Sequence, residues 1–441
     1  MERRTFLGNF AAGSAAAGMA AIGGSQAHGQ TKPVAVRNSF RAADFGVVGD
    51  GVADDTAAIQ RAVNEASAMG GGTVYLEGSA GRNFRCAGQL SFDGKHGVIL
   101  SGNPAQGGRE SPQLVYTGRN SPFISIKSAY AITFEGLKIS YSDRSFSGNL
   151  IETGHGPQKS DSGYLLFDRC IFIGSGGAKN ANTLLSLPLA IFVTIRNCLL
   201  QGSNVAISGR PGAYTNCVQI TDCTFAHQRT VPVRNGGESW LISGCAFEPL
   251  ESGRAGAYRQ EVGTTAYGLV IIGCWMGDVS AGGGCWIDLS AAPSLGLNII
   301  GNRIAPAGTG NDTAVKIGQG NHGVNISGNR MEGPTCIDFT SPYTFGASIS
   351  GNDLQGSVPI AHIENAVQRF VAGQYTTQNH ISGITNMGTG TFAGDGGVRG
   401  SIQLLAQPPG SPTKPQNGDM WTNAQGLFIH LNGVTRKVQL A

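Results

Sequence analysis

The segment VTIRNCLL (193–200) carries the pattern that decides the fold, because the same pattern recurs along the chain. It reads apolar-x-apolar-x-x-(Asn or Cys)-x-apolar. Other clear copies are VQITDCTF (218–225), WLISGCAF (240–247), LNIIGNRI (297–304), VNISGNRM (324–331) and ASISGNDL (347–354). Looser copies are VILSGN (98–103), ITFEGLKI (132–139), LLFDRCIF (165–172) and LVIIGCWM (269–276). Internal repetition of this kind is typical of solenoid proteins.

Each copy alternates for four or five residues, which predicts a strand, and a turn follows. The turn positions are Asn103, Leu137, Cys170, Cys198, Cys223, Cys245, Cys274, Asn302, Asn329 and Asn352. One repeat cannot bury its own apolar face, but stacked repeats can. The sequence therefore predicts an all-β fold, a right-handed parallel β-helix of about ten or eleven coils over residues 40–365. Its Asn and Cys positions should form a ladder at a bend.

The cysteines fit the same interpretation. The chain has nine, an odd number, and no Cys-x-x-Cys pair or zinc-type spacing. Five of them occupy the ladder, where Cys acts as a small apolar residue. We expect buried free thiols and no metal site, although disulfides between neighbouring rungs stay open as an alternative.

Composition restricts the function. The chain has 441 residues, 40% of them hydrophobic and only 13% charged, with 68 glycines and a net charge of +3. This excludes wholesale disorder, charge-laced helical bundles and collagen. No long apolar stretch predicts a membrane span. No Lys/Arg block is long enough to follow a phosphate backbone, so nucleic acid is not an expected partner.

The first residues predict an export signal. The chain opens MERRTFLG, continues with an Ala/Gly-rich run, and reaches Ser25-Gln26-Ala27. A charged start, an apolar middle and an Ala-x-Ala-like end are typical of a signal peptide, and the paired arginines resemble the twin-arginine type. We expect a signal peptide over 1–27, cleavage after Ala27, an N-terminal extension over 28–39, and a periplasmic or extracellular protein.

A capping helix is predicted ahead of the repeats. Ile59, Ala62, Val63 and Ala66 share one helical face, with Asp55 or Thr56 at the N-cap. Gly70-Gly71-Gly72 ends this helix, and Thr73–Leu76 starts a strand. Such a helix would cover the open end of a β-helix, which otherwise exposes unpaired backbone.

The string DFGVVGDGVADDTAAIQ…GGGTVYL, within residues 40–76, resembles the opening of the pectate-lyase-3-type, glycoside-hydrolase-28-related β-helix proteins. That resemblance implies a right-handed β-helix and carbohydrate substrates, but it does not fix the reaction. It also implies that Asp50, Asp54 and Asp55 are mainly structural. The chain lacks the Asn-Thr-Asp and Arg-Ile-Lys motifs of polygalacturonases.

Candidate catalytic residues lie just beyond the ladder. His227, Glu248 and Asp278 follow Cys223, Cys245 and Cys274 by three or four residues on consecutive coils. Coils about 4.8 Å apart would bring two carboxylates within the range that glycosidases use. Glu248 and Asp278 are therefore the predicted catalytic pair, with His227 beside them. A solvated column of turn residues is the alternative.

Further candidates would bind substrate. The segment ESGRAGAYRQEVG (251–263) supplies Arg254, Tyr258, Arg259 and Glu261; its Arg side chains suit a uronate carboxylate, and Tyr or Arg suits base catalysis. Trp275 and Trp286 are expected to stack on sugar rings. A second candidate, the loop over 141–163, holds Asp143, Arg144, Glu152, His155, Lys159 and Asp161. No cofactor is expected; calcium stays open, but no local Asp-x-Asp-x-Asp loop supports it.

The C-terminal part departs from the repeat. Residues 366–416 are rich in Gly, Thr and Pro and predict a linker. Residues 417–441 predict a small β module, with hairpin turns at 423–426 and at Asn432-Gly433. The module resembles those that end phage tail fibres, so it could form the tip of a homotrimer; a simple cap on the last coil is the alternative.

Three functions follow as expectations. The first is an exported enzyme that degrades an acidic polysaccharide or exopolysaccharide, by hydrolysis or β-elimination. The second is a non-catalytic glycan-binding or structural β-helix of the tailspike kind. The third is a uronate epimerase acting on a polymer.

Overall fold

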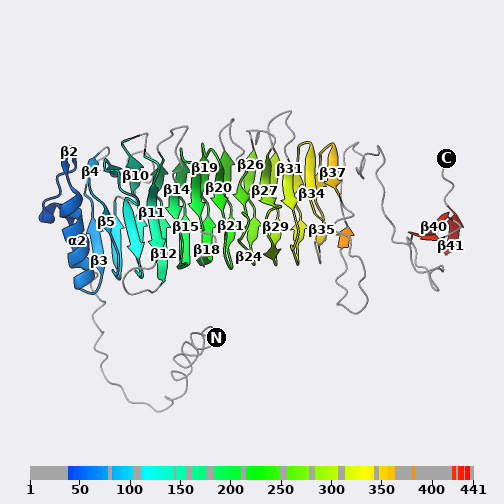
Figure 1. The fold of residues 1–441 in the computed structure, drawn as a ribbon, viewed down its shortest axis with the longest axis horizontal. Coiled ribbons are helices and arrows are strands. Elements are labelled where there is room, and N and C mark those ends of the chain that lie inside the picture. The colour runs from blue at the N-terminus through cyan, green and yellow to red at the C-terminus, as the bar shows by residue number, and fades with distance from the viewer. Residues whose placement is uncertain are drawn as a thin grey trace, which may run out of the picture. The chain divides into compact units, whose positions relative to one another are not determined.

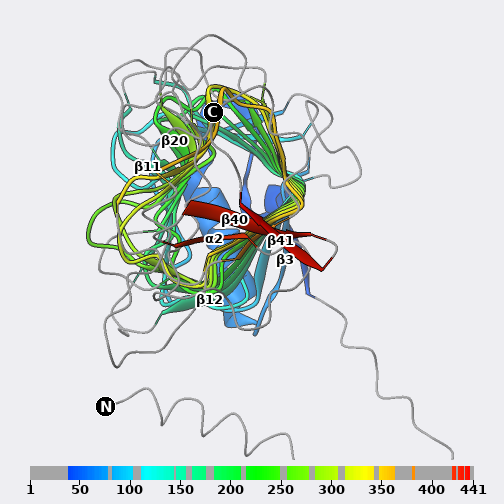
Figure 2. The ribbon, with the colours of Figure 1, turned by 90° about the vertical axis from the view of Figure 1, so that its right-hand side faces the viewer.

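The computed structural model describes residues 38–77, 82–102, 111–143, 146–154, 161–174, 183–209, 215–248, 256–277, 284–305, 313–341, 347–362, 380–382, 420–423, 426–431 and 433–437. Its main body is the predicted right-handed parallel β-helix. Three parallel sheets of 13, 12 and 11 strands enclose a common interior, and each coil contributes one strand to each sheet in turn (Figures 1 and 2). The predicted fold class is confirmed.

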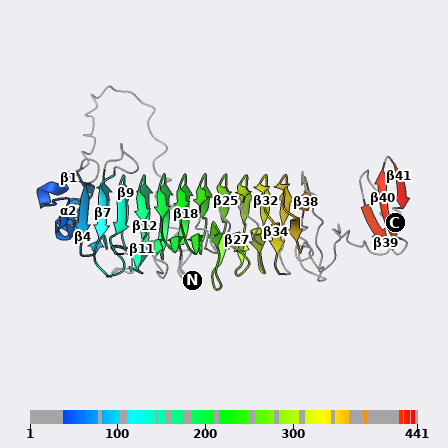
Figure 3. The same cartoon turned by 90° about the horizontal axis from the view of Figure 1, so that it is seen from above.

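Sheet A runs in chain order, with each strand beside its counterpart on the next coil (Figure 3). Its strands are β1 (Ser39–Arg41), β3 (Gly72–Tyr75), β6 (Val98–Ser101), β9 (Thr133–Glu135), β12 (Ser162–Asp168), β15 (Ala190–Arg196), β18 (Thr215–Thr221), β21 (Leu241–Ser243), β25 (Val270–Ile272), β29 (Asn298–Ile300), β32 (Asn325–Ser327), β35 (Ser348–Ser350) and β38 (His380–Ser382). β24 (Ala266–Tyr267) and β28 (Ser294–Leu295) form a short parallel pair.

Sheet B follows sheet A along each coil. Its strands are β2 (Asp50–Asp54), β4 (Asn83–Cys86), β7 (Gln113–Tyr116), β10 (Lys138–Tyr141), β13 (Ile171–Ile173), β16 (Leu199–Gln201), β19 (Thr224–Ala226), β22 (Ala246–Glu248), β26 (Trp275–Gly277), β30 (Arg303–Ala305), β33 (Arg330–Met331) and β36 (Asp353–Leu354).

Sheet C closes each coil. Its strands are β5 (Leu90–Ser91), β8 (Ile124–Lys127), β11 (Asn149–Gly154), β14 (Thr183–Ser186), β17 (Val205–Ser208), β20 (Val231–Arg234), β23 (Tyr258–Arg259), β27 (Cys285–Leu289), β31 (Thr313–Ile317), β34 (Thr335–Phe339) and β37 (Val358–Ala361).

The core consists of like residues stacked from coil to coil, as the repeat predicts. In sheet A the register joins Phe134 to Phe167, Ile195, Ile220, Ile242, Ile271, Ile299, Ile326 and Ile349, all buried. In sheet B the rings of Phe225 and Phe247 stack with centroids 4.7 Å apart. Burial of these apolar side chains is the main force that holds neighbouring coils together.

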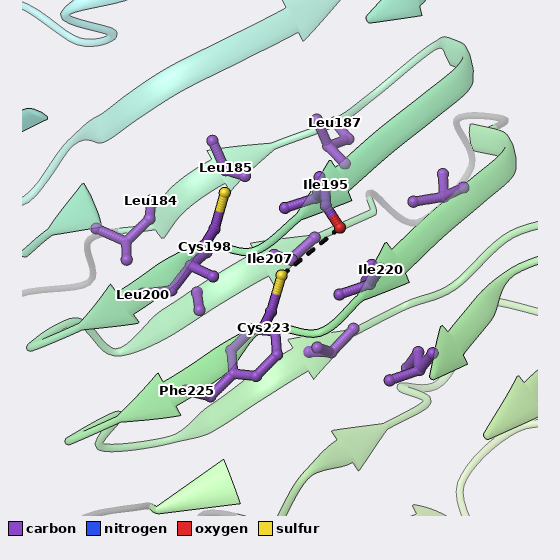
Figure 4. Packing of buried hydrophobic residues seen from close by; sticks show 14 of the residues in the cluster. Leu184, Leu185, Leu187, Ile195, Cys198, Leu200, Ile207, Ile220, Cys223 and Phe225 are labelled. Atoms are coloured by element: carbon purple, nitrogen blue, oxygen red, sulfur yellow. Dashed lines mark hydrogen bonds between the residues drawn. The ribbon is translucent and has the colours of Figure 1, made fainter. Parts of the chain in front are cut away.

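The predicted ladder lies at the bend between sheets A and B. Asn329 Oδ1 accepts bonds from the backbone N–H and the side chain of Asn302, both at 2.9 Å, and Asn352 Oδ1 does the same for Asn329. The thiols fill the same slot: Cys223 Sγ contacts the Ile195 carbonyl at 3.6 Å (Figure 4). The ladder is thus confirmed on the described coils; Asn103 lies outside them.

All nine cysteines are free thiols, and every one except Cys217 is buried. Burial raises the pKa of the Cys336 thiol to about 11 and that of Cys86 to about 12. Cys336 and Cys86 therefore stay protonated at neutral pH, as expected for packing residues.

The capping helix is also confirmed. α2 (Thr56–Ala68) buries Ala58, Ile59, Ala62, Val63 and Ala66 and packs against β1, β3, β5 and β6. A short 3₁₀ turn, η1 (Ala42–Phe45), precedes it. The cap differs from the prediction in one detail: the side chain of Asp55 makes no bond to the helix. Its carboxylate instead accepts from the Val48 and Gly49 N–H groups, at 2.7 and 3.0 Å.

Asp54 joins the helix to the next coil and provides a test of pH dependence. Burial alone would raise the pKa of Asp54. Its carboxylate, however, accepts hydrogen bonds from the backbone N–H groups of Ala87 and Thr56 and from the Thr56 hydroxyl, and these bonds lower the pKa overall. The pKa of Asp54 in the folded protein lies below its value of about 4 in the unfolded chain, so the ionised carboxylate stabilises the fold. This contribution to the free energy of unfolding is complete above about pH 4 and is lost as the pH falls through the folded pKa.

We therefore expect Asp54→Asn to reduce the free energy of unfolding at neutral pH by no more than about 1 kcal/mol, since the carboxylate is mostly exposed. The gap between wild type and variant should close as the pH is lowered from about 5 toward 2. Urea titrations across this range measure it. A difference in the free energy of unfolding that stays constant over this pH range would contradict a stabilising role of the ionised Asp54 carboxylate.

Two segments beyond the repeats are described. β38 pairs in parallel with β35, so sheet A continues past the predicted boundary at residue 365 into the segment taken for a linker. Near the C-terminus, β39 (Met420–Asn423), β40 (Gly426–Leu431) and β41 (Val434–Lys437) form an antiparallel sheet with the two predicted hairpins. No helix in the described residues is long and apolar enough to cross a membrane.

Candidate functional site

The outer face of sheet C carries a row of polar residues, one from each coil. The register aligns Ser125, Glu152, Ser186, Ser208, Arg234, Arg259, Asp288, Lys316 and Asp338. Because side chains alternate along a strand, this row points outward while its neighbours fill the core. The regular coils thus hold a continuous polar strip at spacings of about 4.8 Å.

An open cleft of about 350 Å³ lies over the N-terminal half of this strip. Its lining residues come from β11, β14, β17 and β20, from the turns that follow these strands, and from the turn after β23: Asn149, Glu152, Thr183, Ser186, Pro188, Ser208, Gly209, Arg234, Asn235 and Glu261. Ser186 and Ser208 are small and lie between Glu152 and Arg234 in the row. They form a low floor with a carboxylate at one end and a guanidinium at the other.

Arg234 is held in place by its neighbours. Its Nε donates to the Ser208 hydroxyl at 2.9 Å, and Nη1 lies 3.5 Å from Glu261 Oε1. Asn235 donates to the other Glu261 oxygen at 2.9 Å and accepts from the Glu261 N–H at 3.0 Å. About a third of the Arg234 side chain stays exposed. A preorganised, accessible guanidinium suits a carboxylate or another anionic group of a ligand.

Glu152 is the third charged residue that lines the cleft, after Arg234 and Glu261. Its carboxylate accepts a 2.5 Å bond from the side chain of Asn149. Four coils separate Glu152 from Glu261, about 19 Å between backbones. Even with both side chains extended, this spacing exceeds the about 5–5.5 Å of a retaining glycosidase pair and lies at or beyond the upper limit of about 9.5 Å for an inverting pair. The cleft is therefore suited to one carboxylate acting with one cation.

Tyr258 and Trp286 differ from their predicted roles. Both are buried, with exposed fractions of 1% and 0%, because their strands turn them into the core. The Tyr258 hydroxyl bonds to Gln260 and accepts from the Gly236 N–H at 2.9 Å, and burial raises the pKa of Tyr258 above its ordinary range. The expectations that Tyr258 meets substrate and that Trp286 stacks on a sugar are wrong for this structure.

The predicted pair Glu248 and Asp278 belongs to sheet B, on another face. Glu248 is exposed at the end of β22, level with Ala226 on the preceding coil. His227 is exposed one position later, and its N–H donates to the Glu248 carbonyl at 2.9 Å. Asp278 lies outside the described residues. Trp275 is half-buried and level with Ala246 and Arg303.

Arg259 and the residues of the loop over 141–163 are further sequence-predicted candidates for the site. Arg259 is on β23 in the polar row, with Nε 3.6 Å from Asp288 Oδ2. In the second candidate loop, Glu152 belongs to strand β11 and reaches the cleft, whereas Arg144, His155 and Lys159 lie outside the described residues, as does Arg254. Asp143 and Asp161 do not line the cleft. Sequence reasoning did not anticipate Arg234, because it stands inside a strand; only the register shows that it faces Glu152.

The remaining candidates carry no site chemistry. Asp50 accepts bonds from the Val52 and Ala53 N–H groups, both at 2.8 Å, which lowers its pKa, so with Asp54 and Asp55 it serves the turn and the cap. In the part of the chain that the structure describes, no group of three or more His, Cys, Asp or Glu side chains is arranged to hold a metal ion. That observation gives no support to calcium.

Comparison with known proteins supports the resemblance at the N-terminal end. Residues 39–121 match the family model for rhamnogalacturonase A/epimerase, pectate lyase-like. Mannuronan C5-epimerase AlgE4 of Azotobacter vinelandii is 48% identical over 67 residues, 14% of this chain and 12% of that protein. AlgE1 of the same organism is 65% identical over 37 residues, 8% and 3%. The matched segment is a small part of these relatives.

Solved structures with a similar chain path are distant in sequence. The surface adhesin PfbA of Streptococcus pneumoniae has a TM-score of 0.48 and 14% identity, covering 91% of this chain and 100% of that one. The A-module of Azotobacter vinelandii AlgE6 has a TM-score of 0.45 and 14% identity, covering 78% and 98%. At this level of similarity the fold rests on the sheets described above.

Proposed function

We propose that this protein acts on a uronate-containing polysaccharide in the cleft over sheet C. The observation that carries the proposal is the arrangement of Arg234, fixed by Ser208 and Glu261, facing Glu152 across a floor of small serines. The strip continues along the coils, so an extended chain can lie parallel to the axis. The resemblance to pectate-lyase-like proteins and to mannuronan epimerases supports a polymer of this class.

The chemistry proposed is proton removal next to a uronate carboxylate. Arg234 would pair with the substrate carboxylate and disperse the charge that develops when the adjacent C–H proton leaves. Glu152 would accept that proton as general base. If the C–O bond to the neighbouring sugar then breaks, the products are an unsaturated uronate and a new reducing end. If a proton returns from the opposite face, the product is the epimer.

The first experiment is a panel of polymannuronate, polygalacturonate and neutral polymers incubated with the purified protein. Reducing ends, the ultraviolet absorbance of unsaturated uronate and the NMR signals of the epimer are followed together. New reducing ends with absorbance indicate a lyase, and altered NMR signals alone indicate an epimerase. Reducing ends without absorbance would contradict proton removal and favour hydrolysis.

Glu248 supports a second candidate, hydrolysis on sheet B, because small Ala226 leaves its carboxylate open. Glu152→Gln and Glu248→Gln form a matched pair of substitutions. We expect Glu152→Gln to lower kcat by about 10²–10⁴-fold and Glu248→Gln to leave it unchanged. The reverse result would transfer the site to Glu248 and its proposed partner Asp278.

A glycan-binding protein without turnover is the remaining alternative. It is favoured by one observation: the described residues that line the cleft include no Tyr, His or Lys to act as a second proton donor. Retention of a polymer on the immobilised protein, with no product by any readout, would establish it.

We also propose export by the twin-arginine type of signal, with cleavage after Ala27. When the full chain is expressed with this export pathway, the periplasmic or secreted protein should begin at His28, as measured by intact mass. Arg3→Lys combined with Arg4→Lys should leave the uncleaved chain in the cytoplasm. Normal cleavage of that variant would contradict the twin-arginine interpretation.

A further inference from the structure

Tyr164 and Phe192 stand at a corner where every coil bends in the same way. The register joins His96, Tyr130, Gly163, Ile191, Asn216, Glu238, Tyr267, Leu295 and His322 across consecutive coils. The residue after each of these has a left-handed backbone. This corner row is Gly97, Ala131, Tyr164, Phe192, Cys217, Ser239, Gly268, Gly296 and Gly323, with φ between 54° and 72°.

Glycine is the residue that adopts this conformation without a steric penalty, and it occupies four places of the corner row. Tyr164 and Phe192, with φ of 55° and 54°, carry bulky side chains there. A bulky residue in the left-handed region is strained, and such strain is concentrated where a ligand or a switch requires it. The fold therefore does not explain why two neighbouring coils have aromatic rings at this corner.

The two rings form one exposed platform. Their centroids are 4.9 Å apart and their planes differ by 19°. Tyr164 is 53% exposed and Phe192 45% exposed, whereas most large rings of the described residues fill the core; Tyr75 and Tyr267 are the other exposed aromatic residues among them. Two stacked rings at the surface present a flat apolar face on which the ring of a ligand can stack.

The platform is joined to the cleft along the chain. Pro188, which lines the cleft, is followed four residues later by Phe192, a reach of at most about 14 Å. Tyr164 lies in β12, the strand that follows β11 and its Glu152 along the chain, so each ring follows a strand that lines the cleft. A polymer that leaves the cleft at this side would meet the rings within a few sugar units.

We propose that Tyr164 and Phe192 form an accessory sugar-binding platform for the glycan that occupies the cleft. Pyranose rings present C–H groups on their faces, which pack against aromatic rings, while the Tyr164 hydroxyl offers a hydrogen bond to a sugar hydroxyl. This inference rests on the proposed function of the cleft and adds to it a second contact region, outside the charged strip, that recognises the sugar ring rather than its carboxylate.

A second protein chain does not fit the same patch. A stable protein interface buries at least about 1,000 Å² in total. The platform consists of two side chains, and the exposed residue Glu238 stands at the same corner two coils beyond Phe192. A narrow ligand that alternates apolar faces with hydroxyl groups suits this surface better.

The test compares short and long ligands by titration calorimetry. The probes are the disaccharide and the octasaccharide of polymannuronate and of polygalacturonate. The variants are Tyr164→Gly, Phe192→Gly and the double substitution, because glycine keeps the backbone that it already adopts on four other coils. Tyr75→Ala, at an exposed aromatic residue on β3, is the control. Thermal melting checks that each variant is folded.

We expect the octasaccharide to bind wild type more tightly than the disaccharide. The double variant should lose about tenfold in affinity for the octasaccharide and none for the disaccharide, and Tyr75→Ala should change neither. An unchanged octasaccharide affinity, or an equal loss for both lengths, would overturn the platform. If Arg234→Ala leaves binding intact while the double variant weakens it, the platform stands and the proposed cleft function fails. If wild type binds no probe, both proposals fail.

Discussion

Arg234→Ala is expected to raise the Kd for an acidic polysaccharide by about 10–100-fold, the largest functional effect of any single substitution in the cleft outside Glu152. Two causes add. The substrate carboxylate loses a charge-assisted, two-pronged partner. In addition, Glu261, whose carboxylate is now 3.5 Å from the guanidinium, is left uncompensated and repels an anionic ligand.

Arg234→Lys and the double substitution Arg234→Ala with Glu261→Gln separate these causes. Lysine keeps the charge but not the planar fork, so it should recover part of the affinity. Removing the Glu261 charge should recover the part due to repulsion. Affinity electrophoresis at two salt concentrations measures both, since screening weakens the repulsion. Unchanged retention of every variant would mean that the polymer binds elsewhere.

Asn329→Ala is expected to have the largest effect on stability, a loss of about 3–5 kcal/mol in the free energy of unfolding. Asn329 is buried, and its amide bonds to the Ile299 and Ser327 carbonyls and to Asn352, while its oxygen accepts two bonds from Asn302. Alanine would leave the Asn302 backbone N–H and one N–H of the Asn302 side chain buried without partners, and each such group costs about 1–3 kcal/mol.

Asn329→Cys is the matched control, because the chain itself places Cys at the same ladder position on other coils. In those coils a sulfur partly replaces the oxygen: the Cys170 N–H contacts Cys198 Sγ at 3.4 Å. The cysteine variant should therefore lose about 1–2 kcal/mol less than the alanine variant. Denaturant titration measures the difference, and hydrogen exchange at the Asn302 amide reports it locally. If both variants lose the same free energy of unfolding, the ladder sulfurs fill space but contribute no hydrogen bond.

The sequence predicted the fold well because the repeat expresses a local rule. Apolar residues such as Phe134, Ile220 and Ile326 face inward because side chains alternate along each strand, independently of loop length. Stacking against the next coil then buries them. The capping helix was predictable for a similar reason, since Ile59, Ala62, Val63 and Ala66 are spaced for one helical face. Burial of the cysteines followed from their place in the repeat.

The sequence named Glu152 among the candidates of the loop over 141–163 but did not pair it with Arg234, because a β-helix brings together residues that are separated by whole coils. Glu152 and Arg234 are 82 residues apart in the chain, since 234 minus 152 is 82, and neither belongs to a recognisable motif. The register of sheet C places them over the same cleft. Conversely, Tyr258 and Trp286 have the right chemistry for a sugar site, but their strands turn them into the core.

By itself, then, the sequence determined the coil, its ladder and its cap, because each depends on spacing within one repeat. Tertiary structure alone decided which faces meet a ligand. The loop lengths vary from coil to coil, and the strand register, rather than any motif, sets which side chains share a row. Successive residues of a strand point to opposite faces, so Arg234, level with Arg259, faces outward, and Tyr258, level with Val233, is buried in the core.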